Sequence, residues 1–126
     1  MNISRFLLVL AAALLLIGAV VHAAAFHKAL PIVDASGLPH FYGGSFKGLW
    51  LADSATMLIL AGMLIVTSAQ LHTATRSLLI LIALIPLTTA ILLYTFIGSF
   101  FAGHLLLVIA LLVVVAGFRL PRPAAR

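Results

Sequence analysis

Residues 77–118 read SLLILIALIPLTTAILLYTFIGSFFAGHLLLVIALLVVVAGF and contain no Lys, Arg, Asp or Glu. Gly98 and Ser99 divide this stretch into two apolar runs, 77–97 and 100–118. Each run has the length of about 20 residues that an α-helix needs to cross a lipid bilayer. Neither run alternates polar with apolar residues, so a transmembrane β-strand is excluded. The two runs therefore predict two transmembrane helices that a tight turn holds side by side.

Two more apolar runs, 6–26 and 48–69, precede this pair. Hydrophobic residues make up 65% of the chain and charged residues 7%, whereas a soluble domain has roughly 25% charged residues. The predicted fold is all-α: an antiparallel four-helix transmembrane bundle that forms a single integral membrane domain, 1–126. Its longest connection, 27–47, is expected to be an outer loop because it contains several helix-breaking residues, namely Pro31, Gly37, Pro39, Gly43 and Gly44.

The positive charges predict how the bundle lies in the membrane. Arg5, Arg76 and the three Arg residues of the tail 119–126 fall on one face, whereas Lys28 and Lys47 fall on the other. Short loops rich in Lys and Arg stay in the cytoplasm. We therefore expect an N-in/C-in protein with a cytoplasmic tail, located in a bacterial inner membrane. The net charge of +5 sits at the ends of apolar runs, so it indicates contact with the lipid bilayer and not with nucleic acid.

The N-terminal segment also resembles a secretory signal peptide, because Ala23, Ala24 and Ala25 could form a small-residue cleavage site. The apolar stretch 6–21 is at or beyond the usual length of a signal-peptide core, about 7–15 residues. We therefore expect the segment to be retained as the first transmembrane helix.

Each predicted helix carries one polar side chain near its outer end: His22, Asp53, Tyr94 and His104. These residues lie three to five positions inside the helix ends, a depth of about 5–8 Å. Ionisable residues within a membrane are costly and are functional candidates by default. We expect the four to converge in an outer-leaflet layer that binds a ligand, with His104 as the nearest partner of Asp53. The second helix is expected to lie between the first and the third.

Imidazole and carboxylate groups suit a metal, a haem or a quinone headgroup, so these are the cofactors considered. The candidate metal ligands are His22, His27, His40 and His104. No His-x-x-x-His or Glu-x-x-His pair is present, and the chain lacks Cys, which excludes thiolate zinc sites and iron–sulfur clusters. A metal site would therefore depend on tertiary proximity alone.

The aromatic residues around Trp50 and Phe100 are typical of anchors at the membrane interface, and they would also suit an apolar lid above the polar layer. No serine lies in a Gly-x-Ser-x-Gly motif, so we assign no catalytic residue and do not expect an enzyme. The leading hypothesis is a small polytopic membrane protein that binds a small ligand, metal or quinone-like molecule at the His/Asp/Tyr layer.

Two alternatives stay open from the sequence. One is a non-catalytic accessory or structural subunit of a membrane complex, in which the polar layer fixes helix register. The other is a small oligomeric transporter or channel, which is disfavoured because the cytoplasmic halves of the helices offer no polar path. The sequence leaves open whether the chain forms a homo-oligomer or joins a larger complex.

The first prediction tests the orientation. A reporter that is active only in the cytoplasm, fused after Arg126, should be active because the arginine-rich face stays inside. The matched control is a periplasm-specific reporter at the same position, which should be silent. Activity of the periplasmic reporter with silence of the cytoplasmic one would contradict the predicted topology.

Overall fold

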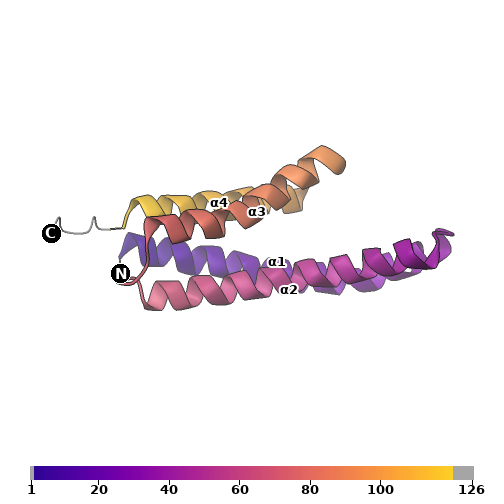
Figure 1. Cartoon of the computed structure of the whole chain (residues 1–126), viewed down its shortest axis with the longest axis horizontal. Helices are drawn as coiled ribbons and strands as arrows, with labels where there is room; N and C mark the ends of the chain where they lie inside the picture. The colour runs from indigo at the N-terminus through magenta and orange to yellow at the C-terminus, as the bar shows by residue number, and fades with distance from the viewer. Residues whose placement is uncertain (1, 121–126) are drawn as a thin grey trace.

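The computed structural model describes residues 2–120, which form four α-helices and no strand (Figure 1). The helices are α1 (Ile3–Ala35), α2 (His40–Ala69), α3 (Arg76–Phe96) and α4 (Phe101–Phe118). All four are long and apolar enough to cross a membrane, which confirms the all-α class and the number of candidate spans within this part of the chain. Most of the predicted tail 119–126 lies outside the described residues.

The predicted outer loop 27–47 is wrong, because helix occupies most of it. α1 continues to Ala35 and α2 already begins at His40, so residues 36–39 alone connect them. Gly37 makes the reversal at φ 68°, a conformation that favours glycine. Further along, a Cβ added at Gly43 would lie 3.9 Å from Val33 Cγ1, an ordinary van der Waals distance, so α1 and α2 remain neighbours beyond the turn.

α1, α2 and their short connection form a helical hairpin, and an ion pair also joins its two helices. Lys47 Nζ lies 2.5 Å from Asp34 Oδ1, and both side chains are partly exposed. Pro31 is accommodated inside α1. The composition of this segment alone predicts a loop. Contacts between α1 and α2 therefore stabilise its helical conformation.

α1 packs against both α2 and α4, and α3 packs against α4. The expectation that the second helix lies between the first and the third is therefore wrong. Within residues 2–120, α2 and α3 do not pack along their lengths. Small side chains line the core of α1, where Ala11, Ala12 and Ala19 are fully buried. Such small residues let transmembrane helices approach closely.

The four helices differ in length, and this difference shapes the end of the molecule at which α1 connects to α2. α1 and α2 have 33 and 30 residues, whereas α3 and α4 have 21 and 18. At 1.5 Å per residue, α3 and α4 are about 27–32 Å long, close to the hydrocarbon thickness of a bilayer, and α1 reaches about 50 Å. The α1–α2 hairpin consequently extends past the α3–α4 turn (Figure 1).

At the end of the molecule opposite the α1–α2 connection, side-chain contacts join the ends of neighbouring helices. Arg5 Nε donates a hydrogen bond to the carbonyl of Ser68, at 2.9 Å, and so satisfies a backbone group at the end of α2. The Arg76 guanidinium lies 5.0 Å from the centre of the Phe118 ring. The start of α1 therefore meets the end of α2, and the start of α3 meets the end of α4.

Candidate functional site

His22 on α1 is held by two residues of α2. Its Nδ1 lies 2.9 Å from the hydroxyl oxygen of Ser54. The Trp50 ring stacks on the imidazole, with centroids 4.6 Å apart and planes 14° apart. Trp50 Nε1 also donates a hydrogen bond to the His22 carbonyl, at 2.8 Å. The imidazole is therefore fixed in place by a stacked ring on its face and by a hydroxyl at its edge.

Asp53 points toward the same imidazole. Its Oδ2 lies 3.8 Å from His22 Nε2, and 37% of its side chain is exposed. The expectation that His104 is the nearest partner of Asp53 is wrong, because α2 packs against α1 and not against α4. His22, Trp50, Asp53 and Ser54 form a cluster that we call the His22 cluster.

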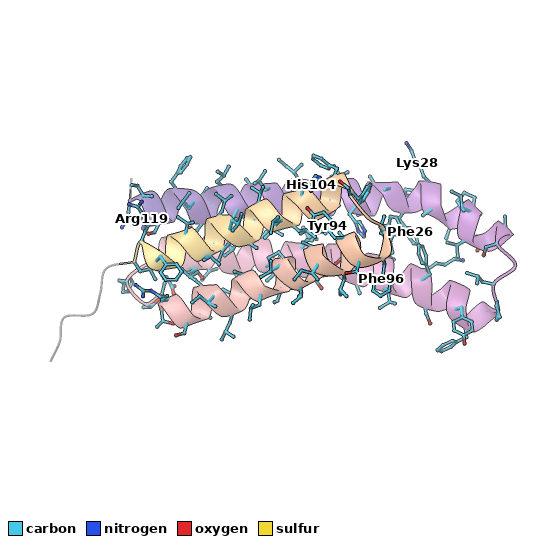
Figure 2. The ribbon with its side chains drawn as sticks, turned by 90° about the horizontal axis from the view of Figure 1, so that it is seen from above. Phe26, Lys28, Tyr94, Phe96, His104 and Arg119 are labelled. Carbon is cyan, nitrogen blue, oxygen red and sulfur yellow. The ribbon has the colours of Figure 1, made fainter. Side chains whose placement is uncertain are left out.

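Tyr94 and His104 form a second, separate pair on α3 and α4. The Tyr94 hydroxyl is hydrogen-bonded to His104 Nδ1, close to the α3–α4 turn (Figure 2). Ser99 Oγ lies 3.4 Å from His104 Nε2. A Cβ added at Gly103 would lie 3.3 Å from the Tyr94 ring, so glycine makes room for the tyrosine. The four predicted site residues are therefore arranged as two pairs on two helix hairpins, and not as one layer of mutual contacts.

A partly open cavity of about 490 Å³ lies between the α1–α2 hairpin and the α3–α4 hairpin. His22, Trp50 and Asp53 are among its lining residues. Thr89 is a further polar lining residue, but its hydroxyl donates to the Ile85 carbonyl within α3. The remaining lining side chains are aliphatic or aromatic, apart from Gly18, and include Met57, Leu93, Phe100, Phe101, Leu105 and Ile109. Tyr94 and His104 are not part of this lining.

The candidate metal ligands do not converge in the part of the chain that the structure describes. His22 and His104 belong to the two separate pairs, whereas His27 and His40 are exposed on the α1–α2 hairpin. Within residues 2–120, no group of three His or Asp residues could hold a metal ion.

Sequence reasoning missed the role of Trp50 and Ser54 in the cluster. Their spacing in the sequence could have indicated it, because Trp50 and Ser54 are four residues apart and so share one face of α2. Comparison of the chain with protein-family models, with curated proteins and with solved structures found no match. A functional assignment therefore rests on the residues and the geometry of the chain itself.

The second prediction tests the His22 cluster through Trp50, the one tryptophan of the chain. His22→Ala removes the stacked ring and the partner of Ser54, so the emission maximum of Trp50 should move to longer wavelength as water reaches the indole. The free energy of unfolding should fall by about 1–3 kcal/mol, the sum of one hydrogen bond and one aromatic contact. Fluorescence and thermal unfolding in detergent would measure both effects.

The matched control is His27→Ala, because His27 lies on the same helix but is exposed. This variant should leave the emission maximum and the stability unchanged. An unchanged spectrum in His22→Ala would contradict the stacking of His22 on Trp50.

Proposed function

We propose that this chain is a single antiparallel four-helix transmembrane domain that binds a membrane-soluble small molecule in the cavity between its two hairpins. One observation carries the proposal: an apolar cavity of about 490 Å³ whose lining includes His22, Trp50 and Asp53. Ligand sites in proteins have volumes of about 300–1,000 Å³, apolar walls and a few polar groups that orient the ligand. The cavity has each of these properties.

The nature of the lining indicates where the ligand comes from. Aliphatic and aromatic side chains cover nearly all of the cavity wall, so a molecule that already partitions into lipid suits it best. α2 and α3 both contribute lining residues, yet they do not pack along their lengths within the described chain. A ligand dissolved in the bilayer would enter between these two helices without first crossing water.

The charges support a position in the outer leaflet. Arg5, Arg76 and Arg119 lie at the ends of the helices opposite the α1–α2 connection, and the positive-inside rule places them in the cytoplasm. Ile97 and Phe100, which flank the α3–α4 turn, line the same cavity as Asp53. The part of the cavity near the α3–α4 turn would then face the outer membrane surface, and the α1–α2 hairpin would extend into the headgroup region.

A second candidate function is that of an accessory subunit in a larger membrane complex. The observation that favours it is the α1–α2 hairpin, whose tip exposes Phe41 at 74% and Tyr42 at 61%. Exposed aromatic side chains of this kind suit a contact with another protein or with lipid headgroups. This role would be compatible with ligand binding in the cavity.

The third prediction tests binding with 11-bromo-1-undecanol, whose bromine quenches tryptophan on contact. Titrated into lipid nanodiscs, this alcohol should quench Trp50 in a saturable manner, because Trp50 lines the cavity. Gly18→Leu should remove the saturable component. Gly18 also lines the cavity, and a Cβ added there would lie 3.5 Å from Leu105 Cδ2, so the larger side chain fills the space without a severe clash.

Gly62→Leu is the matched control, because a Cβ added at Gly62 meets nothing within 4 Å. This variant introduces the same side chain on α2, outside the cavity, and should bind like the unchanged protein. Equal, non-saturable quenching in all three proteins would show that the alcohol only partitions into the bilayer, and it would overturn the proposed function.

A further inference from the structure

The cavity is elongated along the helix axes. On each helix its lining residues recur every three or four positions, as one helical face requires. On α1 this face runs from Leu14 to Ala25, and on α4 it runs from Phe101 to Ile109. At 1.5 Å per residue, these two stretches are about 12–17 Å long. A ligand that fills the cavity therefore lies parallel to the helices.

The cavity also has the depth of one leaflet in the transmembrane arrangement proposed above. Phe101 is the first residue of α4, and Ile109 lies at the middle of this helix. α4 is about as long as the hydrocarbon layer of a bilayer is thick, so the lining ends near the bilayer centre. At its other end, Ile97 and Phe100 line the cavity beside the α3–α4 turn. The cavity thus covers the depth that the hydrocarbon chains of a single leaflet occupy.

The polar side chains of the lining are engaged within the protein. Trp50 Nε1 donates to the His22 carbonyl, and the Thr89 hydroxyl donates to the Ile85 carbonyl. His22 and Asp53 contact each other, with Nε2 and Oδ2 3.8 Å apart. A ligand with polar groups along its length would leave them unpaired in an apolar space, which is costly. The wall therefore favours a plain hydrocarbon over the ring of the quinone-like ligand considered from the sequence.

The length and the volume of the cavity both correspond to one hydrocarbon chain. An extended polypeptide advances about 3.3–3.6 Å for every three backbone atoms, and an extended alkyl chain advances similarly. A length of about 12–17 Å then holds about 10–14 carbons. A water molecule, which is close in size to a methylene group, takes up about 30 Å³, so a volume of 490 Å³ holds about 16 such groups. One chain nearly fills the cavity, and two do not fit.

The arrangement of the helices suits a lipid that stays in its leaflet. α2 and α3 line the cavity but do not pack along their lengths within the described chain, so a hydrocarbon chain can move sideways between them. The headgroup of the same lipid would remain at the membrane surface throughout. α1 and α2 continue past the α3–α4 turn and offer it a surface there (Figure 1).

We propose that the cavity takes one extended hydrocarbon chain of a lipid, about 10–14 carbons long, with the polar headgroup outside at the level of the α3–α4 turn. This inference rests on the proposed function, because it names the class of ligand for the same cavity. It involves binding alone, with no covalent or redox step.

The fourth prediction tests the shape of the ligand by photolabelling in nanodiscs of dioleoylphosphatidylcholine. The probe is an analogue of 1-dodecanol with a diazirine ring at carbon 11. Because the chain end reaches the deep part of the cavity, mass spectrometry should locate adducts on Met57 or Ile109, which are 7% and 1% exposed. Leu92 is 55% exposed and lies outside the lining, so its adducts report probe that is only dissolved in the bilayer.

Two competitors of equal carbon number separate an extended ligand from a compact one. 1-Dodecanol can extend along the cavity, whereas cyclododecanol cannot. 1-Dodecanol should halve the adducts on Met57 and Ile109 at a mole fraction about tenfold lower than cyclododecanol, a difference equivalent to about ten carbon–carbon contacts. Neither alcohol should reduce the adducts on Leu92.

Two phospholipids with the same twelve-carbon chain test the place of the headgroup and the source of the chain. Lauroyl-lysophosphatidylcholine should compete as effectively as 1-dodecanol, because its headgroup stays outside the cavity. Competition by dilauroylphosphatidylcholine as well would identify the ligand as a chain of an ordinary bilayer lipid, and competition by the lysolipid alone would identify a single-chain lipid. Competition by neither would overturn the external headgroup.

A pair of threonine variants tests where the chain ends. Thr89→Phe places a ring at the deep end of the α3 lining, so it should largely abolish the adducts on Met57 and Ile109. Thr88→Phe is the matched control. The Thr88 hydroxyl donates to the same Ile85 carbonyl, but its side chain is exposed and outside the lining, so this variant should keep the adducts.

The possible failures of the inference and of the proposed function are distinguishable. Equal competition by the two alcohols, or adducts that survive Thr89→Phe, would overturn the extended chain alone. Absence of adducts on Met57 and Ile109 despite saturable quenching of Trp50 by the brominated alcohol would do the same. Absence of both the adducts and the saturable quenching would overturn the proposed function as well.

Discussion

α1 packs against α2 along one side and against α4 along another, and the positions of the cavity and of both polar pairs follow from this double contact. Ala11, Ala12 and Ala19 bury small side chains along α1, so two neighbours can approach it closely. With α1 in this place, α2 and α3 are left without extensive mutual packing in the described chain. The space between the hairpins remains as the apolar cavity.

The same double contact determines how the polar side chains pair. His22 projects from the helix that touches α2, so Asp53 finds its partner there, at 3.8 Å. Tyr94 and His104 are brought together by the short connection between α3 and α4. A charged residue within a membrane is tolerated when it meets a partner or lines a polar space. Asp53 satisfies this condition through His22, and it is also among the residues that line the cavity.

The sequence was sufficient to predict the elements that apolar runs define. The boundaries of α3 and α4 agree with the predicted runs, 77–97 and 100–118, to within one residue, because Thr75 and the Gly98–Ser99 turn mark them. The hairpin around Gly37 was not predictable in the same way. Its prolines and glycines favour a loop locally, whereas the pairing of Asp34 with Lys47 across the two arms is a tertiary interaction.

The candidate site shows the same division between local and tertiary information. His22, Asp53, Tyr94 and His104 were identified by depth in their helices, and the structure brings them together two by two. Depth does not determine which helices become neighbours, so the sequence could not predict that Asp53 pairs with His22. The stacking of Trp50 and the hydroxyl of Ser54 depend on the same choice of neighbours.

The measurement that tests this account most directly is a crystal structure of the protein grown with 11-bromo-1-undecanol, recorded at the bromine absorption edge. Our account predicts an anomalous bromine peak inside the cavity, near the apolar side chains of Met57 and Ile109. Bromine peaks confined to the lipid-facing surface, with the cavity free of ligand density, would contradict it.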